Sequence, residues 1–217
     1  MQPGADPLAG EVQLRYATSL TDEEYVCQRA WETATLSRCP LHPAGNCEFS
    51  RHTSYARKRP DGARVARYYC RTARVTFSLL PDCLASRLSG SLDEVEAVVA
   101  VAETASTLTQ AAQQLRPELA DVRHALRWLR RRTMPVRAAL TALVTLLPAL
   151  SGVAPTVTVV REELGTGQVL MTIRELISDQ LASLRSPVGL RARATPCRGT
   201  AAVSQHKAGP DPPARSR

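Results

Sequence analysis

The sequence predicts a mainly α-helical protein with a small β module in its first half, a helix-turn-helix in the middle and a disordered C-terminal tail. Three observations predict this organisation. Cysteine and histidine residues gather in the first half beside β-rich runs, helix start signals recur from residue 91 onward, and the composition after residue 187 holds too few apolar residues to fold. A chain of 217 residues is long enough for several small modules.

Net charge and amino-acid composition divide the chain into five segments. The net charge is −4 over residues 1–36, +7 over 37–90, zero over 91–133 and +5 over 134–217. Of the 28 basic residues, 26 are arginine, whose planar fork matches phosphate groups and guanine edges, so we expect a polyanionic partner. The expected segments are a loose segment with a short helix (1–36), a cysteine-containing β module (37–90), a helix-turn-helix (91–133), C-terminal helices (134–186) and a disordered basic tail (187–217).

The N-terminal segment contains one helix start. Residues 1–20 are rich in proline, glycine and alanine, and we expect them to be loose. Thr21 is followed by three carboxylates, an arrangement that is typical of an N-cap and a first helical turn. We therefore predict a short amphipathic helix over about residues 22–36.

The second segment is predicted to be a metal-centred β-hairpin. Two β-rich runs, residues 64–69 and 74–80, lie on either side of Cys70. A module this small with few aromatic residues usually needs a metal to fold. Without a metal, the same module would have to be held together by its tyrosine, phenylalanine and leucine side chains.

The candidate ligands are three cysteines and one histidine. Cys39 and His42 are three residues apart, Cys47 follows after five more, and Cys70 follows after a further 23. Tetrahedral zinc takes four thiolate or imidazole ligands, which this set supplies. Cys39-Pro-Leu-His42 resembles the first knuckle of a zinc ribbon, so we expect a zinc-ribbon-like module with one structural Zn²⁺. Three ligand sets remain open, in which the fourth ligand is His42, His52 or Cys83.

Two further helix starts predict the helix-turn-helix. Ser91 and a glutamate three residues later form a capping-box pattern, and apolar residues then recur at helical spacing. A third start at Ser106 or Thr107 leads to Leu115, and Arg116-Pro117 then breaks the helix before the next one begins near Glu118.

The helix from Glu118 is the candidate DNA-binding element. Its apolar residues follow the spacing of a buried stripe, and its arginines project away from that stripe. A basic face above an apolar stripe suits a helix that lies in the major groove of double-stranded DNA and grips phosphates. The stripe is Leu119, Val122, Leu126 and Leu129, and the candidate DNA-binding residues are Arg123, Arg127, Arg130 and Arg131.

Two more helices are expected in the C-terminal part, one over about residues 135–147 and one over 170–184, before the tail begins at 187. The start of the chain lacks the pattern of a signal peptide, and no apolar run approaches the length of a membrane span. We therefore expect a cytoplasmic protein without a membrane partner, in which the cysteines are ligands or free thiols.

Residues 37–133 resemble the zinc-ribbon and helix-turn-helix front half of bacterial insertion-element transposases, and in particular stand-alone transposase-like proteins. The resemblance lies in CPLHPAGNC, the Tyr-Tyr-Cys that ends at Cys70, the following TFSLLPDC and the closing RWLRRR. It implies zinc binding through Cys39, Cys47 and Cys70, and DNA contact through the arginine-rich helix. The chain departs from its relatives after Cys70, where Ala73, Arg74 and Val75 stand in place of a further cysteine or histidine.

These features predict a non-catalytic DNA-binding protein of a mobile element, with no small-molecule substrate. The three widely spaced carboxylates of a transposase catalytic domain have no counterpart in residues 134–217, so we expect no strand-transfer activity. The alternative is an accessory factor that binds a transposase or a second copy of itself, or a decayed remnant. A weaker enzyme hypothesis would pair Cys70 or Cys83 with His52 as nucleophile and base.

Overall fold

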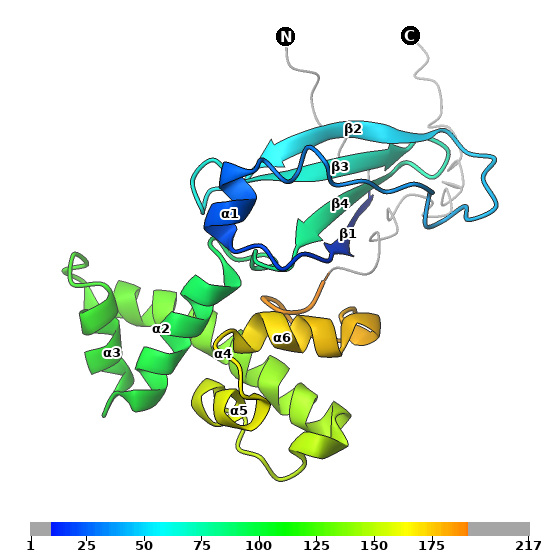
Figure 1. Ribbon diagram of the computed structural model, residues 1–217. Helices are drawn as coiled ribbons and strands as arrows, with labels where there is room; N and C mark the ends of the chain where they lie inside the picture. The colour runs from blue at the N-terminus through cyan, green and yellow to red at the C-terminus, as the bar shows by residue number, and fades with distance from the viewer. Residues whose placement is uncertain (1–9, 191–217) are drawn as a thin grey trace, which may run out of the picture.

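The computed structural model describes residues 10–190 and combines one β-sheet with a layer of helices (Figure 1). Most of the helices gather on one side of the sheet, and α1 lies beside it. The elements in chain order are β1 (Gly10–Tyr16), α1 (Asp22–Cys27), β2 (Phe49–Ala56), β3 (Arg64–Cys70), β4 (Val75–Pro81), α2 (Leu92–Thr104), α3 (Leu108–Leu115), α4 (Val122–Leu146), α5 (Val157–Leu164) and α6 (Val169–Leu176). Short 3₁₀ turns follow α4, at Pro148–Leu150, and α6, at Ser178–Gln180.

The sheet is larger than the hairpin that the sequence predicts. Its strand order is β1-β4-β3-β2, with β3 antiparallel to both neighbours and β1 parallel to β4. The expectation that residues 1–20 are loose is wrong for Gly10–Tyr16, because the whole strand pairs in register with Val75–Pro81. Arg15 of β1 also donates to the buried Asp82 carboxylate at 2.8 and 2.9 Å. The expectation of a mainly α-helical protein with a small β module is therefore confirmed only in part, because six helices accompany a four-stranded sheet within the described residues.

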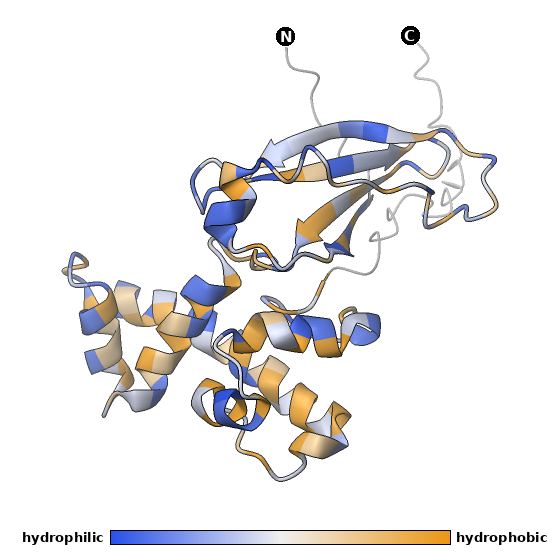
Figure 2. Cartoon of the chain, in the orientation of Figure 1, coloured by the Kyte–Doolittle hydropathy of each residue, from blue (hydrophilic) through white to orange (hydrophobic). Residues whose placement is uncertain are grey.

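The two inner strands were predictable, whereas the outer strand β2 was not. β3 and β4 coincide with the predicted β-rich runs. β4 is almost entirely buried, while β2 is mostly exposed. Figure 2 shows that β2 is also mostly polar. An exposed edge strand lacks the hydrophobic alternation by which strands are recognised. A register shift between Arg51 and Thr53 marks a bulge in this edge.

Three predicted helix starts are confirmed, whereas the helix expected from Glu118 begins at Val122. Thr21 and Ser91 each form a complete capping box with the glutamate three residues later, and the Thr107 side chain caps α3. The first helix is shorter than predicted, because it ends at Cys27 rather than near residue 36. Arg29 then adopts a left-handed conformation with φ of 49°, which turns the chain away from the helix axis.

The largest difference from prediction is α4, a single helix of 25 residues that runs through Pro135. Two separate helices were expected here, with Pro135 at the start of the second. Proline in a helix interior costs about 3 kcal/mol, because it removes a hydrogen bond and crowds the preceding turn. Packing on both sides of Pro135 offsets this cost: Ala125 and Leu129 are buried against α2 and α3, while Leu140 and Leu143 enter the main core. Of the predicted apolar stripe only Leu129 is fully buried.

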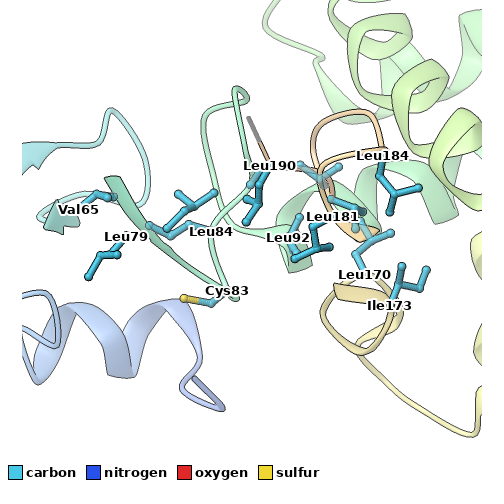
Figure 3. Close-up of a cluster of buried hydrophobic side chains, with 14 of the residues drawn as sticks. Val65, Leu79, Cys83, Leu84, Leu92, Leu170, Ile173, Leu181, Leu184 and Leu190 are labelled. Atoms are coloured by element: carbon cyan, nitrogen blue, oxygen red, sulfur yellow. The ribbon is translucent and has the colours of Figure 1, made fainter. Parts of the chain in front are cut away.

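The main core lies between the sheet and the helices and continues past residue 187 (Figure 3). Leu84, Leu92 and Leu170 meet here with Val188 and Leu190, both of which are less than 10% exposed. The tail therefore does not begin at residue 187. Its remaining predicted part, 191–217, lies outside the described residues, and α6 ends at Leu176, well before residue 184.

Arg174 on α6 joins three parts of the chain inside this core. Its side chain is fully buried and donates hydrogen bonds of 2.8–3.0 Å to the carbonyls of Pro81, Asp82, Leu84, Pro187 and Val188. Burial lowers the pKa of its guanidinium to about 10, which still leaves it charged at neutral pH. One buried cation therefore satisfies carbonyls from the end of β4, from the segment before α2 and from residues 187–188.

Two carboxylates on α2 position α5 and α6. Glu96 is 3% exposed and accepts from Arg161 at 2.8 Å and from the backbone N–H of Leu170 at 2.9 Å. Glu103 accepts from the backbone N–H groups of Val157 and Thr158 at 2.9 and 3.2 Å, at the start of α5. Negative charge at a helix N-terminus is favourable, because the first N–H groups have no partner within the helix.

Glu96→Gln is expected to lower the free energy of unfolding by about 2 kcal/mol, because a neutral amide weakens two charge-assisted hydrogen bonds in a buried site. Urea unfolding followed by circular dichroism measures this loss. Glu162→Gln on the exposed side of α5 is the matched control and should change stability by less than about 0.5 kcal/mol. Equal losses in both variants would show that Glu96 does not hold α6.

Between residues 10 and 190, no helix offers the apolar length that crossing a bilayer requires.

Candidate metal centre and basic helix face

The candidate ligands converge because of the pairing between β2 and β3. Phe49 lies opposite Cys70 in this antiparallel pair, so Cys47, two residues before Phe49, comes close to the end of β3. The backbone N–H of Arg71 donates to the carbonyl of Glu48 at 2.8 Å and extends the pairing past Cys70. Residues 23 positions apart in the sequence thereby reach one end of the sheet.

A tight loop brings Cys39 and His42 to the same point. The N–H of His42 donates to the carbonyl of Cys39, and the N–H of Gly45 donates to the carbonyl of His42, at 3.1 and 3.0 Å. Gly45 and Asn46 both have positive φ, of 89° and 59°, and reverse the chain just before Cys47. Glycine and asparagine adopt this conformation at the lowest cost, so the local sequence favours this loop.

The four ligand atoms form one cluster. The Sγ atoms of Cys39, Cys47 and Cys70 and a ring nitrogen of His42 all lie within 4.8 Å of one another. His42 Nδ1 is 3.4 Å from Cys39 Sγ and 3.5 Å from Cys70 Sγ. A tetrahedral metal with bonds of about 2.0–2.3 Å places its ligand atoms roughly 3.5–3.8 Å apart, so the cluster could hold a metal ion with little movement.

A zinc ribbon would carry a second cysteine shortly after Cys70, and this chain lacks it. Ala73 stands at that position, and its backbone N–H donates to Cys70 Sγ at 3.4 Å. Cys47, on the other side of the hairpin, and His42 complete the group of four candidate ligand atoms. The departure from the ribbon pattern thus leaves a cluster of four ligands rather than three.

The thiols of the cluster differ in acidity. Burial raises the pKa of Cys39, but hydrogen bonds from His42 and the backbone outweigh it and lower the pKa to about 7. The pKa of Cys47 is raised to about 11, by desolvation and by its neighbours Cys39 and Cys70. Since thiolates are the metal-binding form, a bound cation would release protons from this cluster, and from Cys47 above all.

The other two candidates for the fourth ligand lie elsewhere. His52 is exposed on β2, with its ring centroid 5.8 Å from that of Tyr69. Cys83 is 2% exposed within the main core, and burial raises the pKa of its thiol to about 12 (Figure 3). Neither residue belongs to the cluster, and a neutral buried thiol is a poor nucleophile as well as a poor ligand.

The four predicted DNA-binding arginines share one exposed face of α4. Within residues 10–190 none of them forms an ion pair with a carboxylate. They surround a shallow hollow of about 600 Å³ whose apolar floor includes Leu126 and Met134. We call this surface the α4 face. It consists of Arg123, Arg127, Arg130 and Arg131, all exposed, around Leu126, Met134 and Pro135.

Trp128 on the same helix is only half-buried. The guanidinium groups of Arg116 and Arg132 lie over its ring, 4.9 and 4.3 Å from the centroid. Each contact is a cation–π interaction, which favours this placement of the two guanidinium groups. His124, one turn earlier, pairs with Asp121 at 2.7 Å.

Comparisons of the chain with protein-family models, with curated proteins and with solved structures gave no match.

Proposed function

We propose that this protein is a non-catalytic, zinc-containing DNA-binding protein of the mobile-element type. The observation that supports this proposal best is the α4 face, where four exposed arginines lie along one side of a helix and have no carboxylate partner among residues 10–190. Unneutralised guanidinium groups attract phosphates strongly, and a helix can enter the major groove. The sequence resemblance to insertion-element transposases points in the same direction.

The proposed metal is one structural Zn²⁺ held by Cys39, His42, Cys47 and Cys70. Three thiolates and one imidazole are a ligand set that zinc prefers, and hard cations such as Mg²⁺ avoid it. Four protein ligands fill a tetrahedral site and leave no position for substrate, so the ion would stabilise the fold rather than take part in a reaction.

The helix-turn-helix assignment rests on α3, α4 and the connection between them. Ala111 and Ala112 of α3 pack against Ala125 and Leu129 of α4 in a small second core. Small residues let the two helices approach closely and leave the opposite side of α4 exposed. We propose that α4 is the helix that reads or grips the duplex.

The first test measures binding of a duplex of about 20 base pairs by fluorescence anisotropy over a salt series. Arg123→Ala with Arg130→Ala is expected to weaken binding about tenfold and to lower the slope of log K against log salt by about 1.8, because two phosphate contacts disappear. The matched control is Arg137→Ala with Arg185→Ala, which removes the same charge from exposed positions outside the α4 face. Equal behaviour of the two double variants, or no binding by the parent, would contradict the proposal.

The alternative of an accessory factor for a transposase has less support. It would be favoured if the apolar residues between 138 and 147 faced solvent. Ala139, Leu140 and Leu143 are instead fully buried in the main core. Most of the apolar side of this part of α4 is therefore used within the chain, and Leu146 is the exposed large apolar residue there, at 37%.

A further inference from the structure

A second basic surface lies beside the α4 face, in a groove of about 1040 Å³ between two loops of the sheet and the helices α2, α3 and α4. Seven lysine and arginine side chains line it, against two carboxylates. We call it the interlayer groove. Six of these cations are Lys58 and Arg59 from the β2–β3 loop, Arg87 from the loop before α2, Arg116 at the C-cap of α3, and Arg131 and Arg132 from α4.

The two carboxylates do not neutralise this groove. Glu118 pairs with Arg116, and a side-chain oxygen of Glu94 accepts the backbone N–H of Ser91 at 3.2 Å in the capping box of α2. Within the described part of the chain, Lys58, Arg59, Arg87, Arg131 and Arg132 form no ion pair. Burial first, and then the charge of Arg116, lowers the pKa of Arg132.

The loops that supply these cations are held in place. Arg57 donates to the carbonyls of Ala85 and Leu88 at 2.7 and 2.5 Å, and the N–H of Gly90 donates to the carbonyl of Arg59 at 3.2 Å. Arg87 keeps a left-handed backbone with φ of 58°, which is unfavourable for arginine and needs support from its surroundings. Two loops distant in sequence thus form one fixed basic rim.

The interlayer groove joins the α4 face directly, because Arg127 and Arg131 line both. We propose that the phosphodiester backbone of a DNA strand that crosses the α4 face continues through the interlayer groove and is held there by Lys58, Arg59 and Arg87. This inference rests on the proposed DNA binding and adds a contact surface from the sheet. A phosphodiester backbone is favoured over a single phosphate group as the occupant, because the cations extend along a groove and do not converge on one point.

The test uses the full chain and a triple variant, Lys58→Ala, Arg59→Ala and Arg87→Asn. Asparagine is chosen at position 87 because it tolerates positive φ. Duplex affinity should fall about tenfold or more, and the salt slope should fall by about 2.7, the amount for three lost phosphate contacts. The control is Arg38→Ala, Arg137→Ala and Arg185→Ala, three exposed cations outside both surfaces, with thermal melting to verify that each variant is folded.

The outcomes separate this inference from the proposed function. If Arg123→Ala with Arg130→Ala weakens binding while the groove variant binds like its control, DNA binding stands and the groove inference is wrong. If only the groove variant weakens binding, the interlayer groove contacts DNA but the α4 face does not, and the continuous path across both surfaces is overturned. Absence of binding by the parent overturns both. Inorganic phosphate at matched ionic strength should not compete with duplex DNA, and competition at low millimolar concentration would indicate a discrete phosphate pocket and overturn the backbone path.

Discussion

Cys70→Ser is expected to abolish metal binding and to lower the melting temperature by on the order of 10 °C. Cys70 ends β3, is fully buried and contacts both His42 and the N–H of Ala73, so its loss removes a ligand and leaves a polar group inside the cluster. A structural zinc ion contributes several kcal/mol to the folding of small modules, and each kcal/mol shifts the melting temperature of a chain this size by about 2–4 °C. Elemental analysis should give one zinc per parent chain and none in the variant.

Cys27→Ser is the matched control for this experiment. Cys27 is exposed at the end of α1 and lies outside the cluster, so this change should preserve both the zinc content and the melting temperature. A parent protein without zinc, or a Cys70→Ser variant that keeps its zinc, would exclude the proposed ligand set. Cys39→Ser should behave as Cys70→Ser does.

The second large effect is expected from Arg174→Met, which should lower the free energy of unfolding by about 4 kcal/mol. Methionine fills a similar volume but donates no hydrogen bond, so five carbonyls lose the Arg174 donor at once. The carbonyls of Pro81 and Pro187 keep the backbone N–H groups of Leu84 and Ser86 as partners. An unsatisfied buried acceptor costs about 1–3 kcal/mol, and relaxation of the surroundings recovers part of the sum. At about 2–4 °C per kcal/mol the melting temperature should fall by about 8–16 °C, as calorimetry would measure.

Arg185→Met separates this effect from the general loss of a cation. Arg185 is exposed and lies close to the same loop, so its replacement should leave stability within about 0.5 kcal/mol of the parent. Arg174→Lys should remain strongly destabilising, because an ammonium group carries three donors at one point and cannot reach carbonyls on both sides. Parental stability in Arg174→Met would show that the carbonyls find other partners.

Local signals in the sequence predicted local structure well. The caps at Thr21, Ser91 and Thr107 and the strands β3 and β4 are readable because each depends on residues a few positions apart. Gly10–Tyr16 also alternates apolar residues, at Val12, Leu14 and Tyr16, but its glycine-rich and proline-rich surroundings hid the strand. Its partner β4 lies 65 residues further along the chain, and such pairing leaves no local signal.

The site shows the same division between local and distant information. The set of Cys39, His42, Cys47 and Cys70 was one of three possibilities, and the structure brings these four together through the register of β2 and β3. Sequence spacing could not decide between His42, His52 and Cys83, because that choice depends on where a polar edge strand pairs. The interlayer groove was not predicted at all, since its cations come from four parts of the chain.

The parallel pairing of β1 with β4 limits how far this protein can be shortened from its N-terminus. A fragment that starts at residue 37 keeps every metal ligand, yet it strips β4 of its neighbour and Asp82 of Arg15. The freed edge would be a seven-residue, largely apolar strand, and exposed apolar edges are the kind through which chains associate. The region around the candidate metal site therefore cannot be separated from β1. Any shortened version intended for expression, or for transfer into another protein, has to carry Gly10–Tyr16 with it.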